Sequence, residues 1–444
     1  MPFDHFFEGG MGSAQRKRSK AVLSQNFVAI LNSPVRKSDT EPIKYIQDRV
    51  NAVLAAESPA TRDALRSQYR EDFMSYLACS ANEPTLDLLG AAPDSLARSL
   101  DNRMMTALNM STATAVGSLT AMQQFLNELG TEIWFSNWLR IVPDPLSPVT
   151  LMNDPVLAAA STGKIDVMRC LLPLIKRAMG RDAYYDQHWP IKTRVYAAIN
   201  AAIKGKHVSI IRILCNFARS HGWKVTNNDY PFRSRNLRYG ELWINDAAAT
   251  GCFHTCRAVL IELSALSPEP RQHWAENLFI CACKHGSAGL LRTMYRRKMA
   301  GNQATRLLGG SYRTLMVPEY SIYIAACHGH VGVVDVLLEH GANIDDALVS
   351  AVQHGRIVLM KHLLRHGAHF TDKLSKKVQN DIRVNYFGLR SVKHRYQVLS
   401  YYLAAKFTVG KWPATKNDKK TKWLIEDVEN SAIWGAKARE LMEM

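Results

Sequence analysis

The sequence has no run of about 20 apolar residues, so no membrane-spanning helix is expected. It has only eight cysteines in 444 residues, and their spacing does not resemble a disulfide framework. This scarcity favours a reducing compartment, either the nucleus or the cytoplasm. Residues 1–12 include acids and lack an unbroken apolar core, so we do not expect a secretory signal there.

The sequence also lacks the usual motifs of catalysis. It has no phosphate-binding loop, no Gly-x-Ser-x-Gly elbow, no His-Glu-x-x-His and no Gly-x-Gly-x-x-Gly. Two clusters, Cys252-x-His254-x-Cys256 and Cys281-x-Cys283-x-His285, have enough ligands for zinc, but a usual knuckle has two residues between its cysteines. We therefore predict a protein that is not an enzyme and that has no cofactor and no metal.

What the sequence does contain is a repeated sequence motif, which we call the phrase and which is clearest over residues 324–342. It has two small residues, a glycine three or four positions later, an apolar stretch, a Leu-Leu pair and then Gly-Ala. An alanine stands four residues before each marker glycine and an apolar residue eight after it. The markers are Gly117, Gly163, Gly205, Gly251, Gly286, Gly329 and Gly355.

Each copy of the phrase predicts two helices joined by a tight turn. Paired small residues allow a helix to approach its neighbour closely, and the glycine can end that helix in a left-handed conformation. The following apolar residues have the spacing of a second helix that faces a core. Six histidines directly precede a glycine, where they can interact with the dipole at a helix C-terminus. They are His221, His285, His328, His340, His354 and His366.

These residues resemble the ankyrin repeat family, most closely at 320–370. Most intervals between marker glycines exceed the period of about 33 residues in that family, which indicates insertions between repeats. The resemblance implies an all-α, ankyrin-type α-solenoid of about seven diverged helix-pair repeats with helical caps at both ends. The predicted order is a flexible basic arm over 1–40, a helical cap over 41–110, the solenoid over 111–370 and a basic helical cap over 371–444.

The resemblance also places a binding surface on the concave helix face. The positions one and two before each marker glycine are not needed for the core of such a repeat, so we predict that they contact a partner. They are Thr162, Lys204, Thr250, Lys284, His285, His328, Gln353 and His354.

Three insertions share a basic and aromatic composition. Residues 176–196, 219–243 and 292–323 contain sixteen Lys and Arg against five Asp and Glu, together with many Tyr and Trp. Such a surface attracts acidic peptides or phosphate backbones. In the alternative interpretation, the aromatic rings hold long loops against the stack and the charges are solvated. We predict that Arg233, Arg235 and Arg238 contribute to partner binding.

A basic run near the N-terminus fits a nuclear import signal, formed by Arg16, Lys17, Arg18 and Lys20. Its surroundings resemble the basic arm of fungal ankyrin-repeat coregulators of secondary-metabolite gene clusters, although Met11 stands where their base-reading Asn would be. We therefore predict an interaction scaffold, a nuclear transcriptional coregulator, that binds an acidic protein through its concave groove and basic-aromatic loops. Two alternatives stay open: nucleic-acid binding by the basic edge and tail, and a cytosolic or host-directed ankyrin adaptor.

Overall fold

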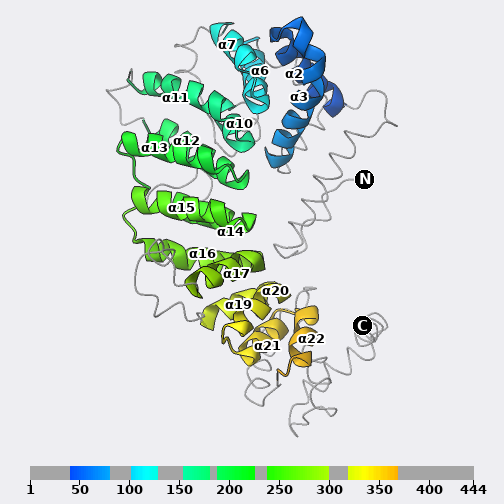
Figure 1. Cartoon of the computed structure of the whole chain (residues 1–444), viewed down its shortest axis with the longest axis vertical. Helices are drawn as coiled ribbons and strands as arrows, with labels where there is room; N and C mark the ends of the chain where they lie inside the picture. The colour runs from blue at the N-terminus through cyan, green and yellow to red at the C-terminus, as the bar shows by residue number, and fades with distance from the viewer. Residues whose placement is uncertain are drawn as a thin grey trace, which may run out of the picture. The chain divides into compact units, whose positions relative to one another are not determined.

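The computed structural model describes residues 41–80, 102–128, 154–180, 188–225, 238–299 and 319–368. The predicted basic arm and the predicted C-terminal cap lie outside these residues. Within them the chain forms sixteen α-helices and no strand (Figure 1). The predicted all-α fold class is confirmed.

Seven helix pairs follow one another, and each has a predicted marker glycine at or beside its turn. They are α6 (Asn102–Val116) with α7 (Leu119–Glu128), α10 (Pro155–Thr162) with α11 (Ile165–Gly180), α12 (His188–Lys204) with α13 (Val208–Ser220), α14 (Tyr239–Thr250) with α15 (Phe253–Leu266), α16 (Arg271–His285) with α17 (Ala288–Met299), α19 (Glu319–His328) with α20 (Val331–Glu339), and α21 (Ile344–Gln353) with α22 (Ile357–Arg365).

The described residues divide between two compact units, one up to Leu278 and one from Phe279 onward. In the N-terminal unit the first helices α6, α10, α12 and α14 pack in sequence, and the second helices α11, α13 and α15 do the same beside them. In the C-terminal unit α19 packs against α21, and α17 packs against α20. Each unit is therefore built of stacked helix pairs.

The small residues of the phrase form the contacts between first helices. Ala159, Ala247 and Ala325 are all completely buried. Cys283, which takes one of these small positions, is completely buried as well, and burial raises the pKa of its thiol to about 12. Close helix approach therefore explains the small residues, as the phrase predicted.

Six of the seven marker glycines adopt the left-handed backbone conformation. The exception is Gly205, for which that prediction is wrong: the left-handed residue is Lys206, with φ 63°. The hydrogen bond that ends the helix is shifted by one residue along the chain there: the His207 N–H donates to Ala202 O at 2.9 Å. A side chain at Gly205 would instead collide with Ser161 O, since a Cβ would lie 2.7 Å from it. The close approach of Ser161 O, rather than a left-handed backbone conformation, explains why residue 205 is a glycine.

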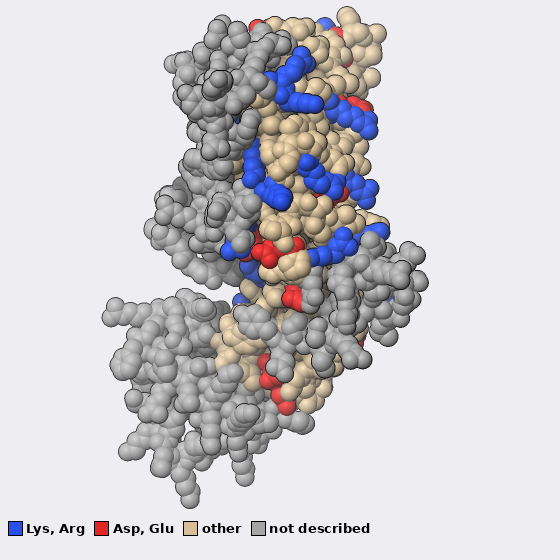
Figure 2. Space-filling view, turned by 90° about the vertical axis from the view of Figure 1, so that its left-hand side faces the viewer, with Lys and Arg blue, Asp and Glu red and all other residues tan. Residues whose placement is uncertain are grey.

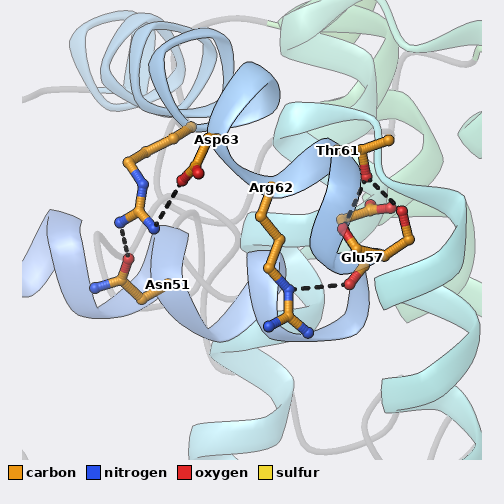
Figure 3. A network of polar contacts seen from close by, with 7 residues as sticks. Asn51, Glu57, Thr61, Arg62 and Asp63 are labelled. Atoms are coloured by element: carbon orange, nitrogen blue, oxygen red, sulfur yellow. Dashed lines mark hydrogen bonds and ion pairs between the residues drawn. The ribbon is translucent and has the colours of Figure 1, made fainter.

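A hairpin of α2 (Glu41–Ala56) and α3 (Pro59–Ser80) precedes the pairs and contacts α6. The helix α3 begins at Pro59 after Ser58, whose hydroxyl lies 3.0 Å from that of Thr61. Figure 3 shows this turn, where Arg62 Nε donates to Glu57 O at 3.0 Å. Polar contacts therefore fix the hairpin turn.

Polar contacts also tie the hairpin to the helix pairs. Lys164 Nζ at the α10–α11 turn lies 2.8 Å from Asp72 Oδ2 on α3. The Ser118 hydroxyl at the α6–α7 turn donates to the Glu57 carboxylate.

Candidate partner-binding surfaces

The eight predicted groove positions lie at the C-terminal ends of first helices, close to the tight turns. Lys204 and Lys284 are exposed, and the other six are half-buried: Thr162, Thr250, His285, His328, Gln353 and His354. The structure therefore places all eight at one edge of their helix pairs, the edge that carries the marker glycines.

In the N-terminal unit these side chains contact their own chain. The hydroxyl of Thr162 donates to Ala158 O at 2.8 Å, and that of Thr250 donates to Ala247 O at 2.7 Å. Lys204 Nζ lies 3.4 Å from Asp246 Oδ2 on the next pair, while its side chain stays 57% exposed. Of these three, only Lys204 presents a charge to solvent.

In the C-terminal unit the same edge gathers positive charge. Lys284, His328 and His354, all predicted, are joined there by His330 and Arg356. The rings of His328 and His330 are nearly parallel, with centroids 5.9 Å apart. Burial lowers the pKa of His328, and the nearby groups of His330, Arg356, Lys284 and His354 lower it further. We call these five residues the basic turn cluster.

His330 and Arg356 were missed by the sequence reasoning, although their positions carry a signal. Each follows a left-handed glycine and reaches back to the preceding helix pair. His330 Nε2 donates to Lys284 O at 2.9 Å, and Arg356 Nε donates to Cys327 O at 2.7 Å. The equivalent residue His207 in the N-terminal unit lies 2.9 Å from Ser161 O. A basic residue directly after the left-handed residue therefore marks a link between pairs.

The histidines that precede glycines act mainly at helix ends, as predicted. Their Nδ1 atoms lie 2.7–2.9 Å from the carbonyl oxygen four residues earlier, so each ring donates to a carbonyl in the last turn of its helix. These residues are His221, His340, His354 and His366.

The predicted basic-aromatic edge is only partly described. Arg233 and Arg235 lie outside the described residues. Arg238 precedes α14, and its backbone N–H donates to Glu241 Oε2 at 3.1 Å. Figure 2 shows groups of Lys and Arg on the side of the N-terminal unit that faces the viewer, with few Asp or Glu among them. The role of the basic edge in binding stays a prediction.

Three aromatic rings of these basic segments are buried and do not lie on an exposed edge. Tyr196, Tyr239 and Trp243 are each at most 2% exposed. The Tyr196 ring lies 5.3 Å from each of the other two rings, and Trp243 Nε1 donates to Tyr196 O at 3.2 Å. Tyr196 lies on α12, and Tyr239 and Trp243 lie on α14, so these rings pack two neighbouring first helices against each other.

Neither zinc cluster of the sequence forms a metal site in the part of the chain that the structure describes, where no three ligand side chains converge. Cys256 is completely enclosed by neighbours, and burial raises the pKa of its thiol to about 12. A protonated, buried thiol packs as a small apolar group.

The sequence of residues 321–348 matches the family model of the ankyrin repeat. This segment covers most of α19, all of α20 and the first half of α21. No curated protein matches the chain at a significant level. Among the described helices, none is both long and apolar enough to cross a membrane. The repeat match and the helix pairs together give an ankyrin-type fold, and ankyrin repeats typically serve as protein-binding scaffolds rather than enzymes.

Proposed function

We propose that this chain is a protein-interaction scaffold whose C-terminal unit binds an acidic segment of a partner protein at the basic turn cluster. The ankyrin repeat over 321–348 supports the scaffold role. The gathering of five basic side chains from three successive helix pairs supports an acidic partner, because a negative segment lowers their mutual repulsion.

The histidines give the proposed binding a pH dependence. His328 carries a lowered pKa while no anion is near, so its neutral form prevails at pH 7.5. A bound carboxylate favours the charged imidazole and raises that pKa. Binding therefore takes up protons, and the affinity for an acidic segment should increase as the pH falls from about 7.5 to about 6.

A direct test uses the full chain and a fluorescent Glu-rich peptide of about 20 residues, with binding measured by anisotropy. The variant Lys284→Ala/His328→Ala/His354→Ala removes the three predicted members of the cluster. If each contact contributes about 0.5 kcal/mol, as exposed ion pairs do, the affinity falls about tenfold. Circular dichroism checks that the helix content is unchanged.

A matched control changes three exposed arginines on the second helices of the same unit, in the variant Arg292→Ala/Arg296→Ala/Arg365→Ala. This control should keep most of the affinity. The control removes at least as much positive charge as the cluster variant. A loss of affinity in the control as large as in the cluster variant would therefore show that the peptide responds to overall charge, and the assignment to the basic turn cluster would be abandoned.

We propose that the predicted edge residues Arg233, Arg235 and Arg238 attract the acidic partner segment at long range. Reversing all three to Glu should slow association with the acidic peptide at low salt, since rim charges act mainly on the association rate. The difference should shrink toward physiological salt, where the Debye length is about 8 Å. Equal association rates across the salt series would remove these three residues from the binding surface.

We also propose that the scaffold works in the nucleus as a transcriptional coregulator. The basic run of Arg16, Lys17, Arg18 and Lys20 supports nuclear import. A fluorescent fusion of the full chain should accumulate in nuclei, and changing these four residues to Ala should move it to the cytoplasm. A fusion that stays cytoplasmic before the change would favour the adaptor alternative.

A further inference from the structure

The second helices of the N-terminal unit carry basic residues at repeating positions. Six residues after the left-handed turn residue stand Arg169 on α11, Arg212 on α13 and Arg257 on α15. Thirteen residues after it stand Lys176 on α11 and Arg219 on α13. All five side chains are exposed. We call these five residues the outer basic grid.

Most of this charge is available to a ligand. Lys176 and Arg257 form no hydrogen bond or ion pair with any described residue. Arg212 forms none either, but its charge acts on the Glu262 carboxyl and opposes the rise in that group's pKa on burial. Arg169 pairs at 3.2 Å with Asp166, an exposed contact that water weakens, and Arg219 lies 3.1 Å from the buried Glu262. Against the two acids Asp166 and Glu262, the five cations of the outer basic grid leave a clear positive excess.

The grid has regular dimensions. Its two rows are separated by seven residues of helix, which corresponds to about 10.5 Å. Along each row the step is the distance between packed helices, about 8–10 Å, because α11 contacts α13 and α13 contacts α15. Cations therefore cover a surface in two directions, instead of following a single line.

The chemistry of the face limits the kind of ligand. Exposed large apolar side chains in the described part are Leu119 and Val358, and neither is on α11, α13 or α15. Protein partners usually need apolar or aromatic anchors, and single-stranded nucleic acids need aromatic rings on which bases stack. The five grid residues provide charge alone, and four of them are arginine, which matches phosphate geometry by two parallel hydrogen bonds.

We propose that the outer basic grid binds the phosphate backbone of double-stranded nucleic acid, without reading its sequence. A duplex presents two lines of phosphates that flank grooves about 6 and 12 Å wide, a separation comparable to that of the two rows. Affinity then comes from the release of counterions. This surface consists of second-helix residues and shares none with the basic turn cluster, so the proposal does not depend on the protein partner proposed above.

The test measures binding of a fluorescent duplex DNA of about 24 base pairs to the full chain over a series of KCl concentrations. The variant Lys176→Gln/Arg212→Gln/Arg257→Gln removes three exposed cations that form no hydrogen bond or ion pair with the described residues, so its fold should be intact. Each phosphate contact contributes about −0.9 to the slope of log affinity against log salt. The slope of the variant should therefore be shallower by about 2.7.

A control with the same loss of charge places the changes elsewhere, in Arg292→Gln/Arg296→Gln/Arg365→Gln, all at exposed residues outside both proposed surfaces. It should retain the parent slope. No binding by the parent chain at 50 mM KCl, or equal slopes in the two variants, would overturn the proposal. A parent chain that floats with anionic phosphatidylserine vesicles but does not bind the duplex would overturn it too, in favour of a membrane surface.

Discussion

Replacing Gly286 by alanine should destabilise the C-terminal unit for two separable reasons. Its φ of +75° lies in the left-handed region, where a residue with a Cβ costs about 1–2 kcal/mol. The new Cβ would also lie 2.7 Å from His330 Nδ1. The ring would have to move and break its bond to Lys284 O, a loss of about 1 kcal/mol. The expected total is about 2–3 kcal/mol.

Gly341→Ala isolates the first of these costs. Gly341 has φ +89°, and a Cβ there would meet no atom within 4 Å. Urea unfolding of the full chain, followed by circular dichroism, should show Gly286→Ala to be less stable than Gly341→Ala by about 1 kcal/mol. In the double variant Gly286→Ala/His330→Ala the obstruction is gone, so the two changes should cost less together than the sum of the single variants.

Two results would refute this reasoning. Equal costs for Gly286→Ala and Gly341→Ala would mean that His330 does not obstruct the turn. Additive costs in the double variant would mean that the ring and the glycine act independently.

Three further predictions concern stability and pH. Gly329→Val should cost about 1–3 kcal/mol, because a β-branched residue is strained at φ +76°, and an unchanged melting midpoint would contradict this. Burial lowers the pKa of His207 below its ordinary value of 6.5, so the native state favours the neutral ring. Its stabilising contribution is complete above that value and is lost as the pH falls below it, so the parent should lose more stability than His207→Gln between about pH 7.5 and 5.5. Arg194→Met should cost about 3–5 kcal/mol in urea unfolding, because it leaves the Asp154 carboxylate buried without its partner, and Asp154→Asn added to it should restore part of the loss.

The helix pairs could be predicted because their signals are local. An alanine four residues before a glycine indicates a close approach of helices, and the glycine indicates a turn. An apolar residue eight positions after the glycine indicates a helix face toward the core. All three features depend on residues that are near one another in sequence. The same pattern misplaced the left-handed residue at Gly205 by one position. There the constraint comes from Ser161 O on the preceding pair, which no local pattern reveals.

The candidate surfaces were harder to predict because exposure depends on distant contacts. Thr162 occupies a groove position by spacing, yet its hydroxyl bonds to its own helix. Tyr196 is part of a polar, basic segment, yet two rings more than 40 residues further along the chain bury it. The basic turn cluster combines side chains from positions on both sides of the glycines, and only the stack brings them together.

The buried pair of Asp154 and Arg194 restricts which helix pairs can be neighbours. Asp154 Oδ1 accepts from the first N–H groups of α10, and its Oδ2 lies 3.1 Å from Arg194 Nε on α12, with both side chains at most 3% exposed. A chain that lost the α12–α13 pair, or in which another pair took its place, would put another helix beside α10 and bury the Asp154 carboxylate with no cation. The α10–α11 and α12–α13 units are therefore matched parts and not interchangeable modules, so a shuffled or deleted array of this protein should fold only if it keeps them adjacent and in order.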